Sequence, residues 1–168
     1  EISDDGKSAV ILEANCETDF VSGGDEFMSF ASAAAKAALA ERPDSVEALV
    51  ELPINGGETI EKTRQEMVAK IGENIQLRRF EILETSAGAF GSYAHGNRMS
   101  VLVEMENGND ELIKDIAMHI AASNPSCVTE EDVPAEMLEK EKEILRAQAL
   151  ESGKPADIVE KMLTGRVK

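Results

Sequence analysis

Aromatic residues and cysteines are scarce in this chain of 168 residues, which has no tryptophan, one tyrosine, five phenylalanines and two cysteines. Cys16 and Cys127 lack the spacing of a metal site. A chain of this length buries roughly 70% of its unfolded surface without a disulfide or a metal. We therefore expect two free thiols in an intracellular protein. No apolar run approaches the roughly 18 residues of a membrane span, and no signal peptide is visible.

Basic residues are also few. The chain has 17 Lys and Arg but 33 Asp and Glu, which gives a formal net charge of −16. Such a surface repels phosphate groups, which argues against direct binding of nucleic acid and against an anionic membrane as partner. A basic protein surface is the more natural partner. The content of 42% apolar and 30% charged residues is typical of a soluble globular protein.

Hydrophobic periodicity predicts an α+β fold. Strands are expected at residues 8–16, 75–83, 87–94 and 98–105, the last three forming an antiparallel meander, with a slip in the alternation near Arg78 and Arg79. Helices are expected at residues 25–40, 58–71 and 135–150, at a segment capped by Asn109 or Asp110, and after Pro155.

A weak internal repeat divides the chain. Residues 10–13 resemble residues 101–104, and the helix start at 25–28 resembles that at 110–113. The repeat predicts two similar lobes at residues 1–72 and 73–168, each a small antiparallel sheet with helices packed on it. The connection between strand and helix is longer in the first copy. A connection longer than the fold requires is a candidate functional loop.

That longer connection carries Thr18, Asp19, Phe20 and Val21, just before Gly23 and Gly24. A phenylalanine in a surface loop has two interpretations. It folds back into the core, with Asp19 capping a turn, or it projects into a pocket of a partner. Burying an exposed phenylalanine is worth roughly 1.5–3 kcal/mol, and aromatic anchors dominate interface energetics.

Two further segments are candidates for a partner interface. Ile71 and Gly72 end the second expected helix, where they form either a core position with a helix cap or a helix end that lets a partner's backbone approach. His95 falls at the tip of the expected hairpin, a position at which histidine is usually solvated. His119 is expected to be a core or boundary residue of its helix.

The sequence offers no convincing catalytic constellation. Two histidines and two cysteines are too few for a metal site, and Gly23–Gly24 lacks the Gly-Lys-Ser/Thr ending of a phosphate-binding loop. We expect no cofactor and no enzymatic activity. The competing hypothesis is a small hydrolase that uses Ser92, His95 and Asp19.

Five segments in order along the chain resemble the elongation factor Ts family, the nucleotide exchange factors of elongation factor Tu. They are NCETDFV at residues 15–21, KIGENI at 70–75 with Arg78 and Arg79 after it, GSYAHG at 91–96, AMHIAASNP at 117–125 and SGKP at 152–155. Together they cover nearly the whole chain.

The resemblance implies a core of two similar α+β lobes and a set of contacts with elongation factor Tu. Asp19 and Phe20, flanked by Thr18 and Val21, would enter the G domain of the partner near its magnesium and phosphate site. Ile71 and Gly72 would contact the same domain, and His95 a different one. A small N-terminal helical domain, a coiled coil and a last strand are expected outside this chain.

The resemblance also implies a cytoplasmic protein, or one of an organelle matrix. It leaves open a homodimer or a heterotetramer with the partner. An alternative function is a binding or assembly module that holds the GTPase without promoting exchange.

Overall fold

The computed structural model describes residues 1–151, without the side chains of residues 149 and 150. Contacts divide the chain into two units, Glu1–Ser123 and Asn124–Lys168, and each is described by itself. The expected helix after Pro155 lies outside the described residues. No helix in residues 1–151 is long and apolar enough to cross a membrane.

The first unit combines strands and helices, which confirms the α+β prediction. Its strands are β1 (Ser8–Asn15), β2 (Pro53–Ile54), β3 (Glu58–Thr59), β4 (Gln76–Glu84), β5 (Ala89–His95) and β6 (Met99–Met105). Its helices are α1 (Asp19–Ser22), α2 (Asp25–Glu41), α3 (Val46–Val50), α4 (Ile60–Ile71) and α5 (Asp110–Ser123). The short elements α3, β2 and β3 were not expected from the sequence.

Strand pairing differs from the expected meander. β1 pairs antiparallel with β4, and β5 pairs antiparallel with β6, so β4 and β5 are not hydrogen-bonded neighbours. The meander was wrong because the apolar side chains of β4, such as Phe80 and Ile82, pack with α2 and β1. The slip near Arg78 is a β-bulge, since Glu13 lies opposite Arg79 while the next residue, Ala14, lies opposite Leu77.

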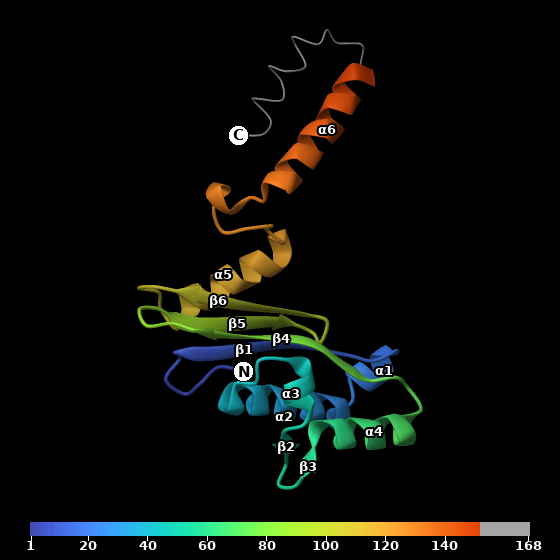
Figure 1. The fold of residues 1–168 in the computed structure, drawn as a ribbon. Coiled ribbons are helices and arrows are strands. Elements are labelled where there is room, and N and C mark those ends of the chain that lie inside the picture. The colour runs from blue at the N-terminus through green and yellow to red at the C-terminus, as the bar shows by residue number, and fades with distance from the viewer. Residues whose placement is uncertain (152–168) are drawn as a thin grey trace. The chain divides into compact units, whose positions relative to one another are not determined.

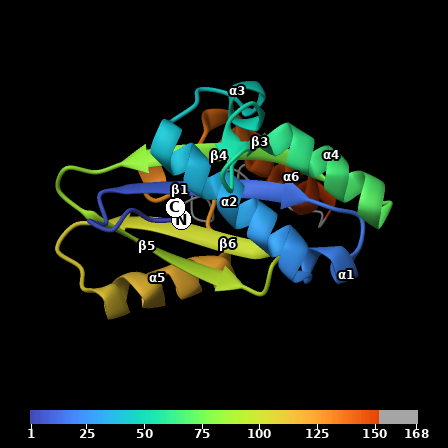
Figure 2. The same ribbon diagram turned by 90° about the horizontal axis from the view of Figure 1, so that it is seen from below.

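The first unit has two apolar clusters. α2 covers β1 and β4 with Phe27, Phe30 and a row of alanines that allow a close approach. α5 packs on β5 and β6, with Ile113 against Gly91, where a Cβ atom would lie 2.2 Å from the Ile113 Cγ2 atom. Figure 1 shows α2 and α5 on opposite sides of the strands, and Figure 2 shows β6 beside β1. Side chains of β4 pack in the first cluster. The lobe boundary between residues 72 and 73 stays a prediction.

Helix ends follow the local signals in the sequence. The Asn109 side chain accepts a hydrogen bond from the Leu112 N–H at 2.8 Å, which makes Asn109 the cap of α5. Thr59 accepts from the Lys62 N–H at 3.2 Å and starts α4 two residues later than expected. Cys16 and Cys127 are half-buried free thiols, as predicted.

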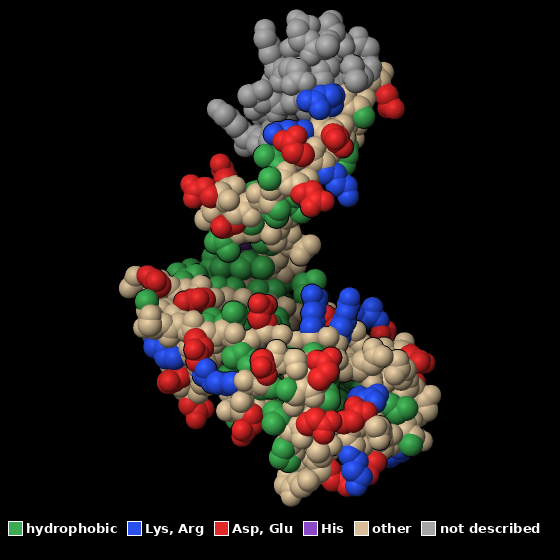
Figure 3. Space-filling view, viewed as in Figure 1, with side chains coloured by type: hydrophobic (Ala, Val, Ile, Leu, Met, Phe, Trp, Pro, Cys, Tyr) green, Lys and Arg blue, Asp and Glu red, His purple; other side chains and the backbone are tan. Residues whose placement is uncertain are grey.

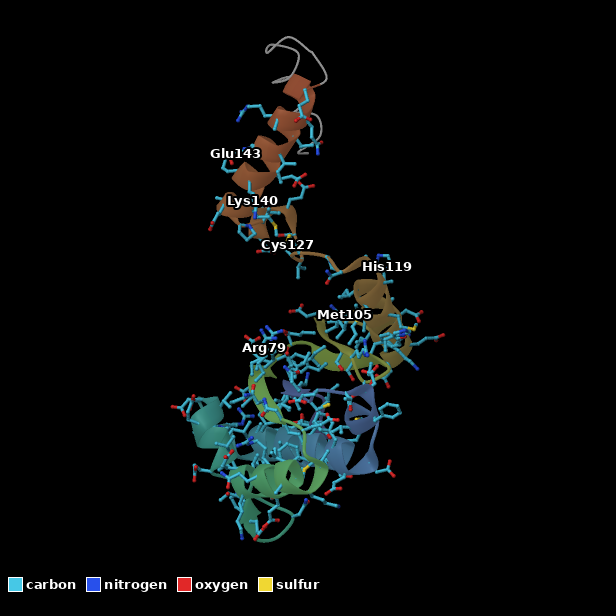
Figure 4. All side chains as sticks on the ribbon, turned by 90° about the vertical axis from the view of Figure 1, so that its right-hand side faces the viewer. Arg79, Met105, His119, Cys127, Lys140 and Glu143 are labelled. Atoms are coloured by element: carbon cyan, nitrogen blue, oxygen red, sulfur yellow. The ribbon has the colours of Figure 1, made fainter. Side chains whose placement is uncertain are left out.

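The second unit contains a 3₁₀ turn, Glu130–Asp132, and α6 (Ala135–Glu151), which confirms the helix expected at residues 135–150. The Thr129 N–H and hydroxyl both donate to the Asp132 carboxylate, at 3.1 and 2.8 Å. Side chains such as Lys140 and Glu143 project from α6 (Figure 4).

Figure 3 shows acidic side chains spread over the visible face of the first unit, in agreement with the net charge.

Candidate functional site

The segment expected to be a loop around Phe20 is a single helical turn, α1. The Gly23 N–H donates to the Asp19 carbonyl and the Gly24 N–H to the Val21 carbonyl, both at 3.0 Å. A Cβ atom on Gly23 would lie 3.2 Å from the Asp19 oxygen. The two glycines therefore let the chain turn tightly from α1 into α2.

Phe20 projects from α1 into solvent. Its side chain is 93% exposed, the most exposed phenylalanine of the chain, whereas Phe27 and Phe30 are buried. Val21 is half-buried against the first apolar cluster. The interpretation of Phe20 as a core residue is therefore wrong, because Val21 faces the core and turns its neighbour outward.

Asp19 is held by a residue from the other half of the first unit. Its carboxylate forms an ion pair with Arg98, in the turn between β5 and β6. Hydrogen bonding and charge attraction from Arg98 lower the pKa of Asp19 below its ordinary value. The Asn97 amide of the same turn donates to the Ser22 hydroxyl at 2.9 Å. The turn thus contacts both ends of α1, which Figure 2 shows beside the end of the hairpin.

His95 is the last residue of β5, three positions before Arg98 in the sequence. It is exposed, as predicted for a hairpin tip, and its Nδ1 atom lies 3.0 Å from the Tyr93 hydroxyl. His119, in contrast, is exposed on α5 rather than at the core (Figure 4), because Ile113 and Ala117 occupy the face that packs on the sheet.

Ile71 and Gly72 end α4 as the helix cap that the sequence predicted. Gly72 adopts a left-handed conformation with φ of 79°, and its N–H donates to the Val68 carbonyl at 2.9 Å. Ile71 is half-buried against the first cluster. The next residue, Glu73, accepts hydrogen bonds from Glu17 and Thr18. The end of α4 is thereby joined to the start of α1.

A groove of about 680 Å³ runs beside α1, between β1, β4 and the turn of the hairpin. Glu13 lies on its wall and pairs with Arg79 at 2.6 Å. Figure 4 shows Arg79 on the side of the strands away from α2. Cys16 also lines the groove, where burial and the nearby Glu73 carboxylate raise the pKa of its thiol.

The groove does not assemble the groups of the hydrolase hypothesis. Ser92 and His95 are three positions apart on one strand, so their side chains point to opposite faces, and the Asp19 carboxylate is bound by Arg98. Within residues 1–151, no group of three or more His, Cys, Asp or Glu is arranged to hold a metal ion.

Sequence reasoning missed the residues that hold α1. Asn97 fell in the turn expected between two strands, Arg98 began the strand expected at residues 98–105, and Ser22 was not singled out. One feature of the sequence could have identified Glu73 as a candidate: it directly follows the helix cap and belongs to the KIGENI segment. Nothing in the local sequence indicates that these side chains meet.

The first unit is thus an α+β fold that presents an exposed aromatic side chain on a short helix, and aromatic side chains are enriched at protein interfaces. Comparison with known proteins identifies its family. The sequence model of the family described as "Elongation factor TS" matches residues 17–168. The chain belongs to the elongation factor Ts family.

Individual relatives carry the same name. Elongation factor Ts of Methylococcus capsulatus is 56% identical over 166 residues, covering 99% of this chain and 57% of the relative. The proteins of Thioalkalivibrio sulfidiphilus and Alkalilimnicola ehrlichii are 53% and 52% identical, again over 99% of this chain, and 57% and 56% of their own length is covered. The chain therefore spans little more than half the length of these curated relatives.

Proposed function

We propose that the protein carrying this chain is a guanine nucleotide exchange factor, which binds elongation factor Tu and promotes the release of GDP during translation elongation. Membership of the elongation factor Ts family supports this function. The observation in the structure that carries it is the 93% exposure of Phe20, held on a helical turn whose other side chains are anchored. We propose the cytoplasm as its location.

Exchange of this kind follows from linkage and involves no bond chemistry. A protein that prefers the nucleotide-free form of a GTPase weakens nucleotide binding by the same factor by which nucleotide weakens its own binding. The exchange factor therefore needs side chains that fit the empty partner better than the occupied one. It needs no acid, base or nucleophile of its own.

We assign the binding roles as follows. Phe20 acts as a wedge between elements of the G domain, and Asp19 disturbs the magnesium and phosphate site beside it. Thr18 and Val21 hold these two residues in place, the latter through its contact with the core. Ile71 and Gly72 contact the same domain, and His95 contacts another domain of the partner.

The decisive experiment measures release of labelled GDP from elongation factor Tu. The complete protein encoded by the gene that carries this sequence is compared with its Phe20→Ala variant. We expect at least a tenfold loss of stimulated release, which corresponds to about 1.4 kcal/mol of lost wedge interaction. Leu112→Ala removes an apolar side chain that is exposed on α5 and serves as the matched control.

Unchanged GDP release in the Phe20→Ala variant would refute the wedge. Stable binding of elongation factor Tu without any acceleration by the unmodified protein would instead support the alternative of a binding or assembly module. The mass of the isolated complex decides between a one-to-one complex and a heterotetramer, and the mass of the free protein tests for a homodimer.

A further inference from the structure

We propose that Glu73 is a positioning residue, which fixes the start of α1 and so holds the Phe20 side chain in its projecting position. The expected effect of Glu73 on GDP release rests on the proposed exchange function. The positioning of α1 by Glu73 rests only on contacts within the first unit.

The Glu73 carboxylate accepts three hydrogen bonds from the two residues before α1. Its Oε2 atom lies 3.2 Å from the Glu17 N and 3.0 Å from the Thr18 N. Its Oε1 atom accepts from the Thr18 hydroxyl at 2.6 Å. In the opposite direction, the Asn74 N–H donates to the Glu17 carboxylate at 3.3 Å. Residues more than fifty positions apart are thus clamped together.

α1 needs such an external clamp because it is only four residues long. A single helical turn is unstable by itself, since fixing its backbone costs more than its few hydrogen bonds return. Thr18 occupies the N-cap position, yet its side chain makes no capping bond within α1. The hydroxyl is directed to Glu73 instead, so the residue before this turn is held by a contact with Glu73 and not by a bond within α1.

Burial of side chains contributes little to fixing the position of α1. None of its four residues is fully buried, and Phe20 has almost no contact surface within the chain. Only Val21 packs against the core cluster from within α1. Polar contacts supplement this single apolar contact in holding α1, with Glu73 before the turn and Arg98 and Asn97 along it.

The same clamp sets the distance between two proposed binding segments. Glu73 follows Gly72 directly, and Gly72 in its left-handed conformation turns the chain away from α4. Because Glu73 contacts Thr18, this contact links the pair Ile71–Gly72 to the pair Asp19–Phe20. A partner domain that contacts both pairs would meet them already arranged, which lowers the entropic cost of binding.

Amide hydrogen exchange and GDP release test the proposal together. In Glu73→Ala, we expect the Glu17 and Thr18 amides to exchange about tenfold faster, since each loses a hydrogen bond, and stimulated GDP release to fall severalfold. Glu73→Gln should retain most of both properties, because its carbonyl can accept from the two N–H groups and its amide can donate to the Thr18 hydroxyl. Glu66→Ala removes an exposed carboxylate from α4 and is the matched control.

A double variant separates positioning from direct contact with the partner. If Glu73 acts through Thr18, then Thr18→Val and Glu73→Ala should have non-additive effects on GDP release. Additive losses, or unchanged exchange at Glu17 and Thr18 in Glu73→Ala, would overturn the proposal. Thr18→Val keeps the test decisive if Glu73→Ala fails to fold.

Failure of the exchange function would look different. In that case Phe20→Ala would leave GDP release unchanged, while the amides of Glu17 and Thr18 would still lose protection in Glu73→Ala.

Discussion

Arg98 and Asp19 form an ion pair across 79 positions of the sequence, between the turn of the β5–β6 hairpin and the first residue of α1. Asn97 reinforces this contact through the Ser22 hydroxyl. The hairpin also carries His95, so two of the proposed contacts with elongation factor Tu, Phe20 and His95, are connected through one polar junction. We call this junction of Asp19, Ser22, Asn97 and Arg98 the hairpin junction.

Removing Arg98 should impair exchange more than stability. Both partners of the ion pair are more than 70% exposed, and surface ion pairs contribute about 0–1 kcal/mol to folding. In Arg98→Ala we therefore expect little change in the free energy of unfolding. Stimulated GDP release should fall, because α1 loses its contact with the hairpin. Denaturant unfolding and labelled-GDP release measure the two effects.

Arg78→Ala is the matched control for Arg98, because Arg78 is also an exposed arginine paired with a carboxylate, that of Glu13 at 3.0 Å. Its partner Glu13 belongs to β1 and not to the hairpin junction, so Arg78→Ala should leave GDP release unchanged. Equal loss of GDP release in both variants would show that the net charge of the surface matters and the hairpin junction does not.

Substitutions of phenylalanine should separate function from folding. Phe20→Ala should change the free energy of unfolding by less than about 0.5 kcal/mol, because exposed side chains contribute little. Phe30→Ala removes a side chain that is 3% exposed, and should cost about 3–5 kcal/mol through the cavity left in the first cluster. Urea unfolding of both variants checks this difference. A large destabilisation by Phe20→Ala would contradict the exposed position.

Gly72 should be needed for its backbone conformation. In Gly72→Ala the new Cβ atom would meet nothing within 4 Å, but the residue would keep a φ of 79°, which costs about 1 kcal/mol for an L-amino acid. Gly57→Ala is the control, since it also has open space but no positive φ. In thermal unfolding, the melting temperature of Gly72→Ala should be lower than that of Gly57→Ala. The reverse order would refute the assignment of Gly72 as the helix cap.

Acid should weaken the contribution of Glu13 to the free energy of unfolding. Hydrogen bonds from Arg79, Asn15 and Arg78 lower the pKa of Glu13 from 4.5 to about 2. Because the folded-state pKa is the lower one, the stabilisation is present above pH 4.5 and is lost as the pH falls towards 2.

The stability difference between the unmodified chain and Glu13→Gln should therefore be about 1 kcal/mol at pH 6 and shrink by pH 3. Urea unfolding at both pH values measures it. Glu66→Gln, whose carboxylate lies 3.9 Å from Lys62, is the control. A Glu13→Gln difference that is constant with pH would contradict the ion-pair assignment.

Much of the fold could be read from local patterns. The strands at β1, β5 and β6, the helices α2, α5 and α6, and the caps Asn109 and Gly72 lie within a few residues of their predicted positions. These features depend on which face of an element is apolar and on where backbone groups need a cap, and both are encoded in neighbouring residues. The family also followed from the sequence, through the order of five short segments.

The sequence by itself thus determined the fold class, the free thiols and the candidate residues Asp19, Phe20, Ile71, Gly72 and His95. Tertiary structure decided the pairing of β4 with β1, the outward direction of Phe20, and the contacts of Arg98 and Glu73 with α1. These contacts join residues more than fifty positions apart, and the packing of whole elements determines which of many compatible side chains come within hydrogen-bonding distance. A local pattern contains no information of that kind.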